Sequence, residues 1–265
     1  MSYRIIAVDM DGTLLDAHGT IPAAFRDVMA YAEDNDVVIA PASGRQLRTL
    51  QDIFGDFSDA VPEAYIAENG TVVSYRGEIV STTALPAEPV HAIIDAAAED
   101  FVVVVCHPDA AYVPVGLPTP VLAELGKYYH STVETPDLHD AVTADVVKVA
   151  VYTPGDAEAE VFPVVEAAAP EVNVVVSGAN WVDVMHRGAD KGVALRALAD
   201  ALGVAQSETV AFGDYLNDYA LLQSAGTAWA MDNAHPELKA IADHIAPSNV
   251  DHGVVTVLKD HFGLE

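Results

Sequence analysis

Two carboxylates, one residue apart, follow the first apolar run of the sequence. The run is Ile5-Ile6-Ala7-Val8, and Asp9-Met10-Asp11-Gly12-Thr13 comes directly after it. A continuous apolar run of this length is typical of a buried parallel strand, and open α/β sheets bind ligands beyond the carboxyl ends of such strands. Two close acids repel each other unless a cation joins them. The pattern therefore predicts a hard divalent cation, a phosphate-facing lysine, or both, with Gly12 allowing an anion to approach the backbone.

A second apolar run ends in the same way. Thr209-Val210-Ala211-Phe212 is followed by Gly213-Asp214-Tyr215-Leu216-Asn217-Asp218. Asp9 and Asp214 would each stand at the carboxyl edge of a strand, where together they could bind one Mg²⁺ ion. A simpler interpretation stays open, because acids and amides also form turns and cap helices.

Two further segments carry groups that suit a phosphate. Ser43-Gly44-Arg45 lies between a predicted strand and a predicted helix, so its hydroxyl and free amides could meet a phosphate oxygen, although Ser43 could be only a helix cap. Lys191 would open a helix over 190–202, where the helix dipole disfavours a cation. A close anionic partner explains the position of Lys191 better than the chance placement of a surface residue does.

Strand-like and helix-like stretches alternate along the chain, which predicts an α/β fold. In the outer parts of the chain, strands are expected at 3–8, 37–40, 64–67, 208–212 and 227–230, a hairpin at 71–75 with 79–83, and helices at 22–34 (capped by Thr20), 190–202 and 216–225. In the middle, helices are expected at 87–100, 119–128 and 156–169, with strands at 101–106, 111–115, 145–152, 172–176 and 181–185.

The change of residue pattern in the middle of the chain predicts two domains. Residues 1–84 and 186–265 are expected to form a Rossmann-like core around a parallel sheet, and residues 85–185 to form an inserted α/β domain.

Composition limits the function. The 265 residues include 12 Lys and Arg against 40 Asp and Glu, a formal net charge of −28, and 51% of them are hydrophobic. Such a chain can bury a sizeable core, but it lacks the clustered positive charge that nucleic acid or an anionic membrane requires. The one cysteine excludes an internal disulfide. We expect no nucleic acid and no membrane as partner, a cytoplasmic location, and an oligomeric state left open between a monomer and a weak dimer.

The four segments around Asp9, Ser43, Lys191 and Asp214 together resemble the four motifs of the haloacid dehalogenase-like superfamily. The resemblance is closest to the Cof-type sugar-phosphatase branch, and it extends to Glu68-Asn69-Gly70 and Ala230-Met231-Asp232-Asn233-Ala234. In that family the insertion is a cap over the active site, and residues 85–185 match it in position.

The resemblance implies a Mg²⁺-dependent phosphomonoester hydrolase that acts on a small phosphorylated metabolite. Asp9 would attack phosphorus and form an aspartyl-phosphate, and Asp11 would be the general acid and base. Mg²⁺ would be bound by Asp9, Asp214 and the backbone carbonyl of Asp11. Asp218, in the same loop as Asp214, would either be a further metal ligand or orient the phosphate, the lysine or the metal's waters.

Ser43 and Lys191 would hold the phosphoryl oxygens, assisted by the amides near Gly12 and Gly44. Asn217 would orient the phosphate, the lysine or the metal's waters. Arg45 and Asn69 are weaker substrate-binding candidates, since turn formation explains Asn69-Gly70 nearly as well.

The resemblance places contacts to the leaving group in the cap, where Asn180 and Trp181 are the candidates. Trp181 could equally belong to the apolar core of the cap. Two other functions remain to be weighed: a phosphoryl-transferring mutase, which normally has only a small cap, and a catalytically inactive phosphate-binding protein, which should have lost a motif residue. This chain retains all four motifs.

Overall fold

The computed structural model describes residues 3–57, 60–97 and 101–264, which fall into two compact units. The core unit comprises Met1–Gly44, Leu50–Ser81 and Asp190–Glu265, and the inserted unit comprises Arg45–Thr49 and Thr82–Ala189. These borders lie within four residues of the predicted ones, apart from the short piece Arg45–Thr49. That piece groups with the insertion because the buried side chains of Gln46 and Thr49 hydrogen-bond to the backbone of residues 128–131.

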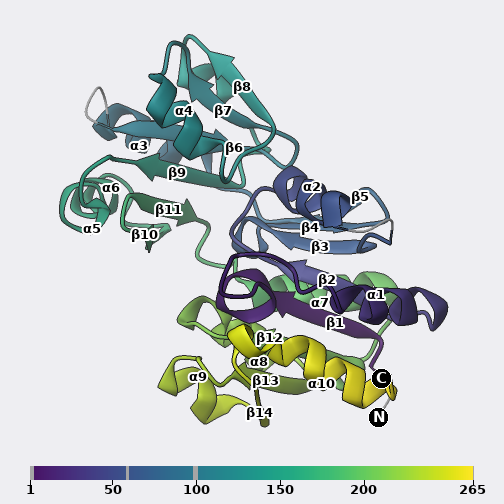
Figure 1. Ribbon diagram of the computed structural model, residues 1–265. Helices are drawn as coiled ribbons and strands as arrows, with labels where there is room; N and C mark the ends of the chain where they lie inside the picture. The colour runs from purple at the N-terminus through teal and green to yellow at the C-terminus, as the bar shows by residue number, and fades with distance from the viewer. Residues whose placement is uncertain (1–2, 58–59, 98–100, 265) are drawn as a thin grey trace. The chain divides into compact units, whose positions relative to one another are not determined.

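The core unit is built on a mostly parallel sheet whose strands run in the order β14-β13-β12-β1-β2-β3-β4-β5 (Figure 1). Its strands are β1 (Ile5–Asp9), β2 (Val38–Ala42), β3 (Ala64–Ala67), β4 (Val72–Tyr75), β5 (Glu78–Thr82), β12 (Thr209–Gly213), β13 (Thr227–Met231) and β14 (His244–Ala246). The pairs from β14 to β3 are parallel, and β4 returns antiparallel to β3.

The strand order reverses at β1. From β1 the chain builds one side of the sheet through β2 and β3, and the later strands β12, β13 and β14 build the other side. A reversal of this kind opens a crevice at the carboxyl ends of the two strands that flank it, here β1 and β12. Ile5–Val8 of β1 is fully buried, because helices cover both faces of the sheet.

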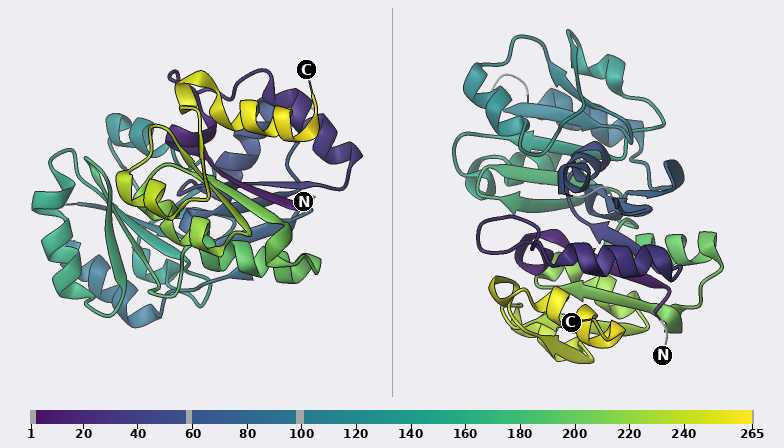
Figure 2. Two further views of the ribbon diagram at one scale, coloured as in Figure 1. Left: turned by 90° about the horizontal axis from the view of Figure 1, so that it is seen from below. Right: turned by 45° about the vertical axis from the view of Figure 1, so that its right-hand side comes forward.

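Helices α1 and α10 lie side by side on one face of this sheet, and α7 and α8 pack together on the other (Figure 1, Figure 2). The helices of the core unit are α1 (Phe25–Asp34), α2 (Leu47–Phe57) from Leu50 onward, α7 (Lys191–Leu202), α8 (Tyr219–Ser224), α9 (Pro236–Ile241) and α10 (Gly253–Phe262). The apolar stripe predicted for α1 is confirmed, since Phe25, Val28, Met29 and Ala32 are all buried.

The inserted unit has its own sheet, in the order β10-β11-β9-β6-β7-β8. Its elements are α3 (Ala87–Ala97), β6 (Val102–Cys106), β7 (Ala111–Pro114), α4 (Thr119–Leu125), β8 (Thr132–Thr135), β9 (Lys148–Tyr152), α5 (Ala157–Glu160), α6 (Phe162–Ala168), β10 (Asn173–Gly178) and β11 (Trp181–Met185). Alternate valines of β6, β9 and β11 pair in register and join α3 and α6 in one apolar core.

Several element predictions were wrong in detail. Thr20 does not cap α1, because its hydroxyl donates to Asp16 and the helix begins at Phe25. The helix predicted over 156–169 is two helices, since Pro163 lacks the N–H that would continue α5 and instead stands in the first turn of α6. The helix predicted over 216–225 begins with a separate turn at Leu216–Asp218 before α8.

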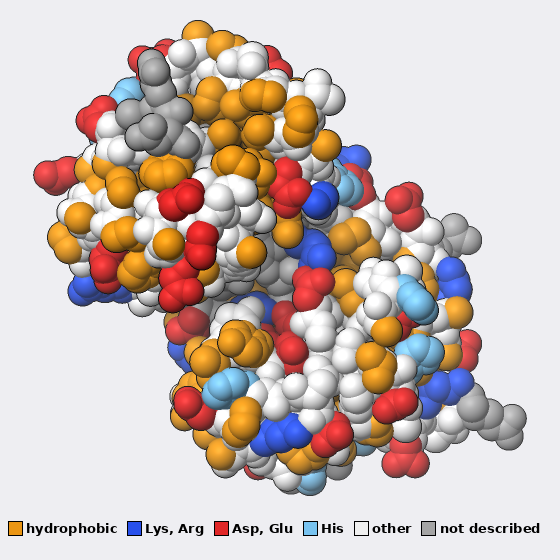
Figure 3. All heavy atoms as spheres, turned by 60° about the vertical axis from the view of Figure 1, so that its left-hand side comes forward, with side chains coloured by type: hydrophobic (Ala, Val, Ile, Leu, Met, Phe, Trp, Pro, Cys, Tyr) orange, Lys and Arg blue, Asp and Glu red, His pale blue; other side chains and the backbone are white. Residues whose placement is uncertain are grey.

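The strand β8 was not predicted, because it is a polar and largely exposed edge strand. Helix α10 was also missed, and residues 98–100 at the end of the predicted helix 87–100 lie outside the described residues. None of the helices that the structure describes is both long and apolar enough to span a lipid bilayer. Acidic side chains are spread over the visible face of the molecule, where basic ones are fewer (Figure 3).

Candidate active site

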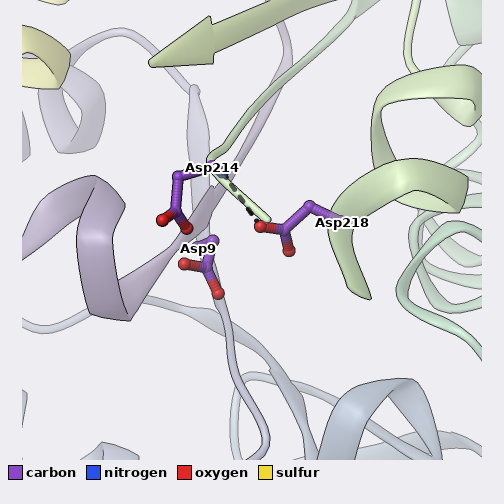
Figure 4. A group of neighbouring side chains, drawn as sticks. All are labelled: Asp9, Asp214 and Asp218. Atoms are coloured by element: carbon purple, nitrogen blue, oxygen red, sulfur yellow. Dashed lines mark hydrogen bonds between the residues drawn. The ribbon is translucent and has the colours of Figure 1, made fainter. Parts of the chain in front are cut away.

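Three carboxylates converge at the carboxyl ends of β1 and β12 (Figure 4). Asp9 is the last residue of β1, Asp214 follows β12, and Asp218 ends the short turn η5 (Leu216–Asp218). One carboxylate oxygen from each of the three lies within 4.8 Å of the others. The parallel pairing of β1 with β12 brings them together, as the two strand-end patterns predicted.

Lys191 is buried among these acids. Its Nζ donates to Oδ1 of Asp9 at 2.5 Å and to Oδ1 of Asp218 at 2.7 Å, and only 1% of the residue is exposed. The lysine begins α7, whose N-cap Asp190 accepts a hydrogen bond from the amide of Val193 at 2.7 Å. Two carboxylates therefore offset the unfavourable interaction between the charge of Lys191 and the helix dipole. They are the anionic partners that the position of this lysine predicted.

Asp218 uses both of its carboxylate oxygens within the protein. Oδ1 accepts from Lys191, and Oδ2 accepts from the backbone amides of Asp214 at 3.1 Å and Tyr215 at 3.4 Å. The side chain thus fixes the loop that carries Asp214 and also aims the lysine. Gly213 leaves room for it, since a Cβ at that position would lie 2.6 Å from the Cβ of Asp218.

Burial and mutual repulsion disfavour full ionisation of the cluster. Burial first, and then the charge of Asp218, raises the pKa of Asp9 well above its usual range, which the hydrogen bond from Lys191 only partly offsets. The same two causes raise the pKa of Asp214 to about 6. Burial alone would lower the pKa of Lys191, but Asp218 and Asp9 raise it above the value of a free lysine. Three carboxylates against one ammonium leave an excess negative charge that suits a divalent cation.

The turn after β1, η1 (Met10–Leu14), lies against Asp214. Gly12 has φ +79°, and a Cβ there would overlap the Asp214 carboxylate, so only glycine allows this approach. The hydroxyl of Thr13 donates to Oδ1 of Asp214 at 3.3 Å. Asp11, in the same turn, is exposed.

The segment after β2 is joined to the segment after β3. The amide of Ser43 donates to the carbonyl of Ile66 and the amide of Asn69 donates to the carbonyl of Ser43, both at 2.9 Å. A Cβ on Gly44 would lie 3.0 Å from Oδ1 of Asn69, so the Asn69 side chain packs against that glycine. Ser43 is buried, with 3% of the residue exposed.

The remaining candidates occupy other places. Asn217 is exposed in η5, next to Asp218, and Arg45 groups with the inserted unit. In that unit Nδ2 of Asn180 donates to the carbonyl of Gly155 at 2.8 Å. Trp181 is 7% exposed, in agreement with the packing alternative, and its indole N–H has no hydrogen-bond partner among the described residues. Its ring lies 5.0–6.2 Å from those of Tyr128, Tyr129 and Tyr152.

Sequence reasoning gave no role to several residues that shape this site. Thr13 bonds to Asp214, Nδ2 of Asn233 donates to the carbonyl of Gly12 at 2.8 Å, and the amide of His235 donates to the carbonyl of Asp214 at 2.8 Å. The segment around Asn233 is indicated only by the family resemblance, and no local sequence pattern indicates its partner.

A separate hollow of about 600 Å³ lies at the opposite end of the strands. Its lining includes Arg4, Val38 and Glu63, which precede or begin β1, β2 and β3. Ligands of open α/β sheets bind at the carboxyl ends of the strands. The carboxylate cluster is therefore the candidate active site.

Comparison with known proteins decides the family. A family model described as haloacid dehalogenase-like hydrolase matches residues 6–258. The chain belongs to this family. The resemblance to its Cof-type branch is confirmed, and so is the predicted class of fold, an α/β core on a parallel sheet with an inserted α/β unit.

Similar haloacid dehalogenase-like proteins are phosphatases by name. The chain is 28% identical over 262 residues to the 5-amino-6-(5-phospho-D-ribitylamino)uracil phosphatase of Escherichia coli K12, covering 97% of this chain and 96% of the relative. It is 28% identical over 245 residues to the HMP-PP phosphatase of E. coli O6:H1, covering 91% and 89%. A solved haloacid dehalogenase-like hydrolase of Bacteroides thetaiotaomicron shares the fold, with a TM-score of 0.84, 24% identity and coverage of 98% and 100%.

Proposed function

We propose that this protein is a Mg²⁺-dependent phosphomonoester hydrolase that acts on a small phosphorylated metabolite through an aspartyl-phosphate intermediate on Asp9. The observation that carries the proposal is the position of Asp9, which is buried at the end of β1, accepts a hydrogen bond from Lys191 and lies close to Asp214 and Asp218. A buried carboxylate beside a cation and a second acid can act as a nucleophile toward a phosphate, whose charge the cations offset.

The donor set fits Mg²⁺, a hard cation that prefers carboxylate and carbonyl oxygens. Asp9 and Asp214 would hold it with their side chains, and Asp11 would hold it with its backbone carbonyl. Asp218 is better suited to orienting Lys191 and the Asp214 loop, because both of its oxygens already accept hydrogen bonds there. When bound, the ion offsets the negative charge of the acids and of the phosphate and polarises a phosphoryl oxygen.

In the first step a carboxylate oxygen of Asp9 forms a bond to phosphorus while the bond from phosphorus to the leaving oxygen breaks. Asp11 gives its proton to that leaving oxygen. Lys191 and Ser43, with the amides near Gly12 and Gly44, hold the equatorial phosphoryl oxygens as charge develops on them.

In the second step water attacks the phosphorus of the aspartyl-phosphate. Asp11, now a carboxylate, accepts a proton from that water, and the bond between phosphorus and Asp9 breaks. Phosphate leaves, and Asp9 and Asp11 return to their starting states, so one carboxylate has served as acid and then as base.

The inserted unit is proposed to act as a cap that recognises the leaving group. Asn180 and Trp181 are the candidate residues for this contact. Arg45, Asn69 and Asn217 are proposed to contribute to substrate binding. A cap that excludes water during the reaction would separate specificity from chemistry.

The direct test is hydrolysis of p-nitrophenyl phosphate with and without Mg²⁺, followed by a screen of phosphate esters of sugars, nucleotides and cofactors. We expect activity that disappears after exhaustive chelation and returns with Mg²⁺. Full activity in chelator would contradict the metal assignment. Transfer of the phosphoryl group to a second sugar phosphate in place of water would identify a mutase.

A further inference from the structure

The turn after β1 is held from outside by two asparagine side chains. Nδ2 of Asn233 donates to the carbonyl of Gly12, and Nδ2 of Asn249 donates to the carbonyl of Leu15, each at 2.8 Å. Asp11 and Gly12 have non-helical backbone angles, so η1 does not have the regular carbonyl pairing of a helix. The two amides, which we call the amide clasp (Asn233 and Asn249), thus bond to one carbonyl inside this turn and to the carbonyl of the residue that follows it.

The clasp is itself connected by hydrogen bonds. Oδ1 of Asn233 accepts from the hydroxyl of Ser248 at 3.2 Å and from the amide of Asn249 at 3.1 Å. These two bonds orient the amide of Asn233, so that its nitrogen faces Gly12 and its oxygen faces the loop before α10. Asn233 therefore has a donor side and an acceptor side with different partners.

The donor side of Asn233 is connected to Asp214 through the turn after β1. Gly12 lies against the Asp214 carboxylate, and the next residue, Thr13, donates to Oδ1 of that carboxylate. Two residues after Asn233, the amide of His235 donates to the carbonyl of Asp214. Residues 233–235 consequently contact both loops of the site, the one after β1 and the one after β12.

We propose that Asn233 is a positioning residue for the metal site. By holding the Gly12 carbonyl it fixes the plane of the Gly12–Thr13 peptide, because the peptide unit is rigid. The Thr13 hydroxyl and the Gly12 backbone then keep the Asp214 carboxylate turned toward Asp9. This inference rests on the proposed function, since it concerns the affinity of the same Mg²⁺ site.

Three variants separate the donor side from the acceptor side. Asn233→Ala removes both. Asn233→Asp keeps the acceptor for Ser248 and Asn249 but replaces the donor with an oxygen that cannot bond to the Gly12 carbonyl. Ser248→Ala is the matched control, because it removes a bond to Oδ1 of Asn233 and leaves the donor in place. Because Asn233 is exposed, neither Asn233→Ala nor Asn233→Asp leaves a buried cavity.

The measurements are the Kd for Mg²⁺ by calorimetry on the full-length protein and the thermal midpoint in chelator. Loss of one hydrogen bond should raise Kd roughly fivefold in both Asn233 variants and less than about twofold in Ser248→Ala, with thermal midpoints close to the wild type. The added charge of Asn233→Asp would by itself tighten cation binding, so weaker binding in that variant points to the lost donor.

Turnover of p-nitrophenyl phosphate gives the second readout. If Asn233 acts through metal affinity, saturating Mg²⁺ should restore the kcat of Asn233→Ala to within about twofold of the wild type. An unchanged Kd in both Asn233 variants, or an equal rise in Ser248→Ala, would overturn the inference. A wild-type protein that neither binds Mg²⁺ nor hydrolyses the ester would instead overturn the proposed function.

Discussion

At the scale of single residues, the candidate site holds more negative charge than its one lysine can offset. Asp9, Asp214 and Asp218 share Lys191, and burial raises the pKa of Asp9 and of Asp214. A carboxyl whose pKa is raised by folding binds its proton more tightly in the folded state. Its stabilising contribution is present at low pH and is lost as the pH rises through the folded pKa.

Metal binding should depend on pH in the opposite direction, because Mg²⁺ requires the ionised carboxylates. The pKa of Asp214 is about 6 without metal, against 3.8 for a free aspartate. Ionisation of Asp214 alone should therefore make Mg²⁺ affinity at least roughly tenfold weaker at pH 5 than at pH 7, and the raised pKa of Asp9 acts in the same direction. Calorimetry at both pH values measures this ratio. Equal affinities would show that the acids of the cluster are already ionised at pH 5.

Asp11 should be separable from Asp9 by the choice of leaving group. General acid catalysis contributes about 10²–10⁴-fold in rate when the leaving oxygen needs a proton. Asp11→Asn should therefore slow hydrolysis of an alkyl phosphate far more than hydrolysis of p-nitrophenyl phosphate, whose leaving group departs with little protonation. Steady-state kcat values for the two esters provide the comparison, and equal losses would mean that Asp11 acts through structure or metal binding.

At the scale of elements, the contact between α7 and α8 sets the position of Lys191. Gly192 follows the lysine, and a Cβ there would overlap the carbonyl of Ala220 and lie 2.5 Å from Oγ of Ser224. Gly192→Ala should destabilise the protein by about 1–3 kcal/mol and lower kcat, because α7 must move away from α8. Thermal unfolding and turnover measure the two effects.

Gly55 provides the matched control for that substitution. It also lies inside a helix, α2, but apart from its chain neighbours and the backbone of that helix, no atom of the described residues lies within 4 Å of the Cβ that an alanine would add. Gly55→Ala should raise stability by about 0.5–1 kcal/mol, because it reduces the freedom of the unfolded chain. A loss of stability in Gly55→Ala, or none in Gly192→Ala, would contradict the packing that holds the lysine.

The sequence predicted elements whose signals are local, and it missed contacts that depend on tertiary structure. Apolar runs identified β1 and β12, and the residue types beyond them identified Asp9 and Asp214. The bond from Asn233 to Gly12 joins residues 221 positions apart in the chain, so no local pattern could indicate it. Pro163 is a local signal for the break before α6, whereas the polar edge strand β8 has no apolar alternation to indicate it.

At the scale of the whole molecule, the reversal of strand order determines where the acids of the candidate active site lie. Asp9 and Asp214 stand beyond the two strands that flank the reversal, although they are more than 200 positions apart. The family combines such a core with an inserted unit, and the division of labour between them remains a proposal. It predicts that substrate preference resides in residues 82–189.

That division can be tested at Asn180. Asn180→Ala should raise KM for the preferred ester and change the order of preference, while kcat for p-nitrophenyl phosphate should stay within a few-fold of the wild type. Trp181→Phe is the accompanying variant, because it keeps an aromatic ring among the tyrosines and removes an indole N–H that has no partner among the described residues. Equal losses for all substrates in both variants would contradict a specificity role.

The central claim is that Asp9 becomes phosphorylated, and the most direct measurement is acid quenching during turnover followed by mass spectrometry of the peptides. A phosphoryl group should appear on the peptide that carries Asp9, borohydride should reduce that residue to homoserine, and Asn in place of Asp9 should abolish both the adduct and turnover. A phosphoryl group on another residue, or full turnover by Asp9→Asn, would contradict the account.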